Sequence, residues 1–208
     1  MTASPGELIN PESLVITLNY DVALERALAK AGKWDIGTGY GFTAFSGRSA
    51  SPTAIYKLHG SVNWFQAPIQ DDPPPLMFSR DLKLLGYEDL SDPRVGGNGN
   101  VGINNTGTLI LPDPDKQFYW ERFWSPLWRT AAARLRQARE VFIHGYSMPQ
   151  SDRKARELLF DNINPRATVN VHCLGDSDRI ADEFRALGFA DARSFPMTGF
   201  EAWATAPE

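Results

Sequence analysis

The chain has 208 residues, of which 42% are hydrophobic, and a formal net charge of −4. This length and composition predict a single folded domain spanning residues 1–208 and exclude a disordered chain. The acidic balance gives no attraction to phosphates, no run approaches the roughly 18 apolar residues that span a bilayer, and no signal peptide is recognisable. We therefore expect a cytoplasmic protein without a nucleic-acid or membrane partner.

The first predicted unit is a strand, a polar turn and a helix. Residues 14–18 form a short β-rich apolar run that ends in the tripeptide 19–21, and apolar residues then recur at helical spacing until Gly32. Residues 54–58 form a second short strand, which ends in His59 and Gly60. Both strands are thus predicted to end in polar residues.

The hydrophobic pattern disappears between residues 63 and 106, where three consecutive prolines and a glycine- and asparagine-rich stretch occur. An irregular segment of this length inside a compact domain is typical of a lid or a small insertion. A strand at 108–111 is expected to follow it.

A long helix is predicted over residues 118–139, with an aromatic stripe that we expect in the core. Four arginines are expected on its solvated face: Arg129, Arg134, Arg136 and Arg139. A strand at 141–144 follows and leads into the tripeptide 145–147.

The last predicted elements alternate helix, strand and helix. Ser151 or Asp152 can cap a helix that runs through residue 159, and residues 168–174 form a strand. The segment 175–178 opens a final helix that Gly188 ends. This alternation predicts an α/β fold, with a mainly parallel, Rossmann-like sheet that has helices on both faces and one irregular insertion.

Ligands of open parallel sheets bind outside the carboxyl ends of the strands. Four such ends carry polar segments here and are expected to converge on one crevice: 19–21, 59–60, 145–147 and 175–178. Each segment alone also has a structural explanation. Helix capping is the structural explanation for Asp21, Asp152, Asp176 and Ser177. Asn19 and Gly145 can be explained by the geometry of a tight turn, and His59 can have a structural role in the core.

The remaining histidines, His144 and His172, lie inside predicted strands and are expected in the core, as is the single cysteine, Cys173. One cysteine excludes a four-cysteine structural zinc site. We expect no bound metal.

Three blocks together resemble the SIR2-like domains of bacteria, which are distant relatives of the sirtuin deacetylases. The blocks are residues 15–21 with Glu25, residues 57–61, and residues 141–147 with Asp152. The resemblance extends from about residue 14 to residue 189.

This resemblance implies a Rossmann-type domain that takes NAD as its substrate and cleaves it to nicotinamide and ADP-ribose, a reaction associated with antiphage defence. It implies catalytic roles for Asn19, which orders the attacking water, and for His59, the base. It implies NAD binding by Asp21 at the nicotinamide, by Gly145 and Ser147 near the ribose and phosphates, and by Asp176 near the adenosine. Other defence-system domains or subunits and a second copy of the chain are the partners that it suggests.

Two departures from the family pattern affect this expectation. The sequence has no glycine-rich Gly-Ala-Gly loop of the kind that cradles the pyrophosphate, so we expect weak or no activity in the chain as given. The zinc-binding cysteines of most deacetylases are also absent, which disfavours lysine deacylation. The main alternative is a non-catalytic module that senses NAD or another nucleotide or binds a partner; a protein deacylase ranks last.

Overall fold

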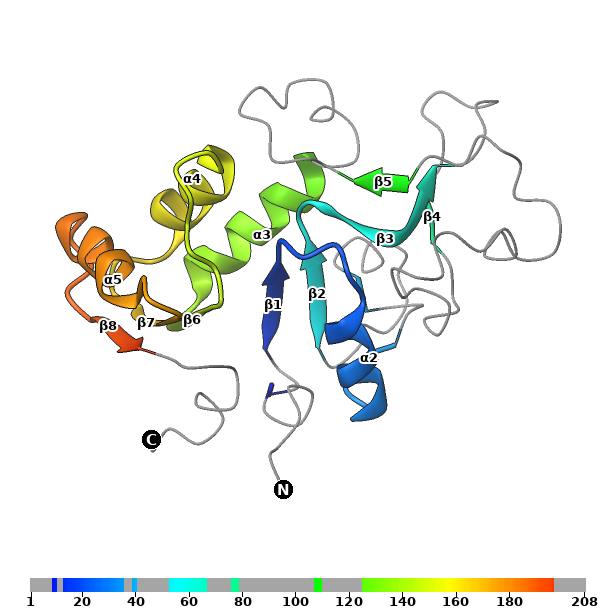
Figure 1. Cartoon of the computed structure of the whole chain (residues 1–208), viewed down its shortest axis with the longest axis horizontal. Coiled ribbons are helices and arrows are strands. Elements are labelled where there is room, and N and C mark those ends of the chain that lie inside the picture. The colour runs from blue at the N-terminus through cyan, green and yellow to red at the C-terminus, as the bar shows by residue number, and fades with distance from the viewer. Residues whose placement is uncertain are drawn as a thin grey trace, which may run out of the picture.

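The computed structural model describes residues 9–10, 13–35, 39–40, 53–66, 76–78, 107–109 and 125–196 (Figure 1). Most of the predicted insertion, and the first part of the predicted helix at 118–139, lie outside these residues. The described residues contain four helices and eight strands, and the strands form three sheets.

The N-terminal unit is a parallel strand pair joined through a helix. Strand β1 (Leu14–Thr17) pairs with β2 (Ala54–Lys57), and α2 (Ala23–Lys30) lies between them in the sequence. The register places Thr17 opposite Lys57, so both strands end at the same edge. The predicted strand, turn and helix are confirmed to within about two residues at each end.

A small antiparallel sheet follows β2. Strand β3 (Gly60–Gln66) pairs with β4 (Leu76–Phe78) on one side and β5 (Gly107–Leu109) on the other. Strand β5 overlaps the strand predicted at 108–111, of which residues 110 and 111 lie outside the described residues, whereas the other two strands were not predicted. Gly60 has a φ of 92°, a backbone conformation that glycine adopts readily, and it lets the chain turn directly from β2 into β3. The sequence pattern indicates an end to β2 here but not the strand that begins at once.

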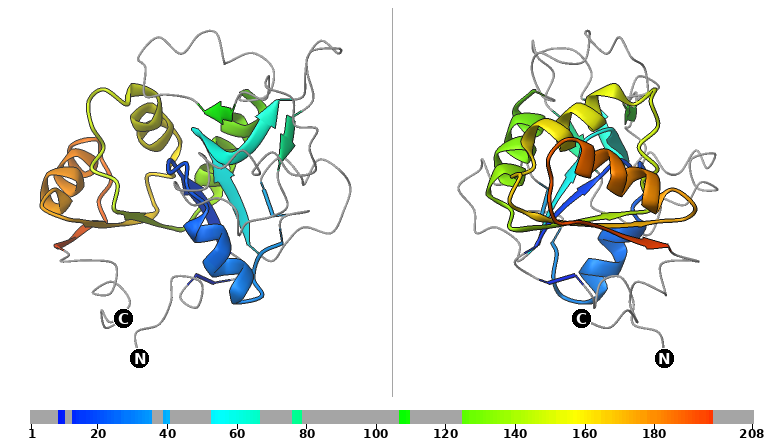
Figure 2. Two further views of the ribbon diagram at one scale, coloured as in Figure 1. Left: turned by 45° about the vertical axis from the view of Figure 1, so that its right-hand side comes forward. Right: turned by 90° about the vertical axis from the view of Figure 1, so that its left-hand side faces the viewer.

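The C-terminal half forms a second parallel sheet, in the order β6 (Glu140–His144), β7 (Thr168–Cys173) and β8 (Ala192–Pro196). Helix α4 (Arg153–Asn162) connects β6 to β7, and α5 (Ser177–Ala186) connects β7 to β8. Figure 2 shows that α4 and α5 lie on the same side of this sheet. Strand β8 was not predicted, because Arg193 and Ser194 interrupt its few apolar residues and leave no recognisable strand pattern.

Helix α3 (Ser125–Gln137) packs against α4 and presents Leu127, Trp128 and Leu135 to the core. The four predicted surface arginines are all exposed, although Arg139 lies just beyond the end of α3. The indole Nε1 of Trp128 donates a hydrogen bond to the carbonyl of Leu58 at 3.2 Å, which connects α3 to the end of β2. The predicted core position of Trp128 is confirmed.

The α/β class with parallel strands connected by helices is therefore confirmed. The described strands form two parallel sheets and one antiparallel sheet, whereas the sequence predicted one mainly parallel sheet. Buried aliphatic and aromatic side chains, such as Leu28, Ile55, Val171 and Phe184, form the core between strands and helices.

Candidate functional site

Asn19 and Asp21 lie exposed just beyond the end of β1. The backbone N–H of Asn19 donates to Thr17 Oγ1 at 3.1 Å, and Asp21 Oδ1 accepts from the backbone N–H of Ala23 at 2.9 Å. The second bond supports the start of α2, but the N-cap position belongs to Val22, whereas capping would require Asp21 there. Both side chains remain accessible to a ligand at this edge.

His59 follows β2 and is buried, with 4% of its surface exposed. Its Nε2 lies 3.6 Å from Oδ1 of Asp152, and the Asp152 side chain is also almost fully buried. The ring centroids of Tyr20 and Trp128 lie 6.2 Å and 6.3 Å from the His59 ring. The imidazole thus lies near two aromatic rings and beside a carboxylate.

The Asp152 carboxylate also connects to the chain beyond β6. Tyr146 donates its hydroxyl to Asp152 Oδ2 at 3.0 Å. Burial, together with the nearby Asp152 charge, raises the pKa of Tyr146 well above its ordinary value, and the same two causes raise the pKa of Tyr20. Both phenols therefore stay protonated at neutral pH and can act as hydrogen-bond donors.

Helix capping by the Asp152 side chain is a prediction that the structure contradicts. Asp152 occupies the N-cap position of α4 but makes no side-chain capping bond. Its two carboxylate oxygens face His59 and Tyr146 instead. Asp152 is the main site residue whose role sequence reasoning missed, although it stands close to the tripeptide 145–147.

Gly145 begins the loop between β6 and α4. It adopts a φ of 66°, and its N–H donates to the carbonyl of His172 at 2.9 Å, so the predicted tight turn is confirmed. Ser147 is exposed in this loop, and the buried Met148 has a φ of 50°, an uncommon conformation for a residue with a side chain.

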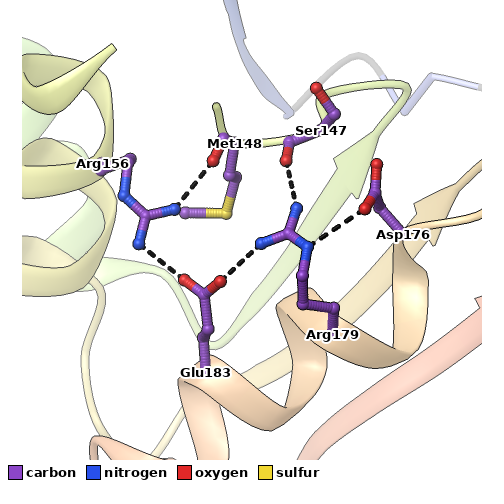
Figure 3. Close-up of polar contacts among 6 residues, drawn as sticks. All are labelled: Ser147, Met148, Arg156, Asp176, Arg179 and Glu183. Carbon is purple, nitrogen blue, oxygen red and sulfur yellow. Dashed lines mark hydrogen bonds and ion pairs between the residues drawn. The ribbon is translucent and has the colours of Figure 1, made fainter. Parts of the chain in front are cut away.

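Two arginines hold the carbonyls of this loop (Figure 3). Arg179 donates to the carbonyl of Ser147 at 2.6 Å, and Arg156 donates to that of Met148 at 2.8 Å. Glu183 forms ion pairs with both arginines. The loop after β6 is thereby fixed to α4 and α5.

Asp176 lies at the start of α5 and accepts from Arg179 Nε at 3.1 Å. It occupies the N-cap position without a side-chain capping bond, so the predicted capping role of its side chain is also wrong. Through Arg179, the segment after β7 meets the loop after β6 (Figure 3).

The four polar strand ends are therefore linked by contacts. Tyr20 lies beside His59, His59 lies beside Asp152, and Arg179 joins Ser147 to Asp176. The β1–β2 register places Asn19 and His59 two residues beyond paired positions. The structure thus brings the predicted segments to one region, while the individual roles of Asn19, Asp21, His59, Gly145, Ser147 and Asp176 remain predictions.

His172 and Cys173 are buried in β7, as predicted, and His144 is half-buried in β6. In the described part of the chain, no three or more His, Cys, Asp or Glu side chains form a group that could hold a metal ion. None of the described helices has the length and apolar character needed to cross a membrane.

The family model of the SIR2-like domain matches residues 13–174, more than half of the chain. The match begins at β1 and ends just after β7, so it includes every site residue named above except those in α5 and Asp176. No curated protein matches the chain.

Proposed function

This chain belongs to the SIR2-like domain family, a sirtuin-related family that binds NAD, and from that premise we propose that it hydrolyses NAD to nicotinamide and ADP-ribose. The observation that carries the proposal is the cluster at the strand ends, where a histidine and a carboxylate lie beside an exposed loop containing Asn19. Histidine beside a carboxylate is an arrangement suited to general base catalysis.

In the proposed reaction the bond between ribose C1′ and the nicotinamide nitrogen breaks, and its electron pair leaves with nicotinamide. Water attacks C1′, and His59 accepts the proton that the water loses. The ribose becomes oxocarbenium-like, so catalysis depends on a placed nucleophile and stabilised charge. The neutral amide of Asn19 can both donate to and accept from a water molecule or a ribose hydroxyl.

The other residues at the strand ends would bind the rest of the substrate. Asp21 is proposed to hold the nicotinamide carboxamide, and Asp176 to lie near the adenosine. Gly145 and Ser147 are proposed to face the ribose and phosphates. Hydrogen bonds from Arg179 and Arg156 to backbone carbonyls hold the loop that contains them (Figure 3). We place this activity in bacterial antiphage defence, alongside other defence-system domains or subunits, because the resemblance suggests that setting.

A second candidate function is a non-catalytic NAD-sensing or interaction module, and the burial of His59 favours it. With 4% of its surface exposed, the imidazole reaches a substrate only if neighbouring groups shift. Tyr20, which is half-buried and beside His59, belongs to the same loop as Asn19 and Asp21. A hydrolase therefore requires side chains around His59, such as the Tyr20 ring, to shift when NAD binds, whereas a sensor does not.

Product analysis separates the candidates. The chain, and a version extended upstream with a glycine-rich phosphate loop, are incubated with NAD, and nicotinamide and ADP-ribose are quantified by chromatography while calorimetry measures NAD binding. Equal amounts of both products from the extended version are expected. NAD binding without products would favour the sensor, and release of nicotinamide only when an acyl-lysine peptide is added would indicate a deacylase.

A further inference from the structure

A lysine and a glutamate form an ion pair in the interior, close to the candidate site. Lys57 ends β2 and Glu25 lies in the first turn of α2, and their side chains are 1% and 0% exposed. The Lys57 Nζ lies 2.7 Å from Glu25 Oε1, which also accepts a hydrogen bond from the Tyr40 hydroxyl at 3.2 Å. The pair is thus enclosed and hydrogen-bonded.

Stability alone does not account for this pair. Removing two charges from water costs several kcal/mol per ion, and apolar replacements of buried pairs are often neutral or stabilising. Burial lowers the pKa of Lys57, and the neighbouring Glu25 opposes that shift. An apolar pair of similar size, such as methionine and leucine, would suit positions 57 and 25 if filling the core were their only task.

The contacts of Lys57 point to a second task. Its ammonium donates to the backbone carbonyl of Asp21, while Lys57 itself stands two residues before His59. The buried Ser61 donates its hydroxyl to the neighbouring carbonyl of Tyr20 at 3.3 Å. Two side chains that flank His59 in the sequence therefore hold two consecutive carbonyls of the loop that contains Asn19.

We propose that Lys57, held by Glu25, is a positioning residue that fixes the 19–21 loop relative to His59. The inference deepens the proposed function, on which its catalytic part rests. Asn19 and His59 belong to different strand ends, and a small error in their separation would lower the rate steeply because both must face one reacting carbon. A charged donor provides a stronger tie to a carbonyl than a neutral one.

The experiment compares the double variant Lys57→Met/Glu25→Gln with the wild-type chain by hydrogen exchange and urea unfolding. The surface pair Lys154 and Glu157, 3.3 Å apart on α4, allows the same two substitutions in a control. We expect the amides of Asn19 and Ala23 to exchange about tenfold faster in the double variant. The Leu58 amide, which donates to Thr17 in the strand pair, and the urea midpoint should stay close to wild type.

A second arm measures nicotinamide release. In the version extended with a glycine-rich phosphate loop, the double substitution should lower kcat about tenfold or more with KM changed less than about threefold, because orientation rather than binding is lost. A folded extended version without the substitutions that releases no nicotinamide would refute the proposed hydrolase, and the exchange data would still decide the positioning role. Wild-type exchange at Asn19 and Ala23 in the folded double variant overturns the proposal. If that variant does not fold, Glu25→Gln alone applies: about threefold faster exchange at both amides supports the proposal, and no change overturns it.

Discussion

Replacing Asp152 by Asn tests the electrostatic arrangement around His59. The substitution keeps the size of the side chain and leaves an amide oxygen to accept from Tyr146. It removes the negative charge that lies 3.6 Å from His59 Nε2. An amide facing the imidazole cannot stabilise the imidazolium that forms when His59 accepts a proton, so turnover should fall while the fold is retained.

The size of the effect follows from the distance. Coulomb's law at 3.6 Å, with an effective dielectric constant of about 20, gives an attraction of about 4–5 kcal/mol between the carboxylate and an imidazolium. Relaxation of the site and the remaining amide dipole would offset part of it. A net loss of a third to a half of that energy in the transition state corresponds to about a 10–50-fold lower kcat.

The assay is nicotinamide release under saturating NAD by the version extended with a phosphate loop, with circular dichroism and urea unfolding to confirm that each variant is folded. Asp161 is an exposed residue near the end of α4, the helix that Asp152 precedes, and it provides the matched control. The Asp161→Asn variant should release nicotinamide at the wild-type rate. A folded Asp152→Asn protein whose kcat lies within twofold of wild type would refute the assignment of Asp152 to the reaction.

Three further predictions concern neighbouring groups. Ser147→Ala should lower kcat/KM less than about tenfold, because Arg179 binds the Ser147 carbonyl rather than its hydroxyl and a neutral hydrogen bond contributes only about 0.5–1.5 kcal/mol. A larger loss in the folded variant would contradict this. Arg179→Ala should raise the KM for NAD several-fold, because it releases the Ser147 carbonyl. The control is Arg185→Ala, which replaces another exposed arginine of α5 and should leave KM unchanged. Equal KM values for the two variants would count against a role of the loop after β6 in NAD binding. Burial, and secondarily the nearby His144, lowers the pKa of His172 below its ordinary value of 6.5. Below about pH 6.5 the unfolded chain therefore binds more protons at this residue than the folded chain, so the stability of the fold decreases on acidification. His172→Phe keeps an aromatic ring against Phe195, so its urea midpoint should fall less between about pH 7.5 and pH 5 than that of the wild type; equal falls would exclude His172 as a source.

The strands and helices with strong periodicity were predictable from the sequence. β1, β2, β6 and β7 are runs rich in β-branched or aromatic residues, and α4 and α5 show apolar residues at helical spacing. Strand β3 was missed because only the two-residue turn of Leu58 and His59 separates it from β2, and Gly60 is already its first residue. Arg193 and Ser194 in β8 concealed its extended conformation, because they leave the strand without a continuous apolar run.

The site was predictable as a set of strand ends, because parallel strands bring their carboxyl ends to one edge. The contact between His59 and Asp152 joins positions 93 residues apart, and no local pattern indicates it. Capping was therefore the natural explanation for Asp152, and it was wrong. Lys57 gave a weak signal, a lysine in a short apolar strand, but its buried partner Glu25 became evident only from the fold.

The central claim, that His59 is the base of an NAD hydrolase, is tested most directly by the initial rate of nicotinamide release from His59→Ala. The measurement uses the version extended with a phosphate loop, alongside Asn19→Ala and the folded wild type. Loss of a general base typically lowers the rate by about 10²–10⁴-fold, and the account predicts a loss in that range for His59→Ala. A folded His59→Ala protein that releases nicotinamide at the wild-type rate would contradict it.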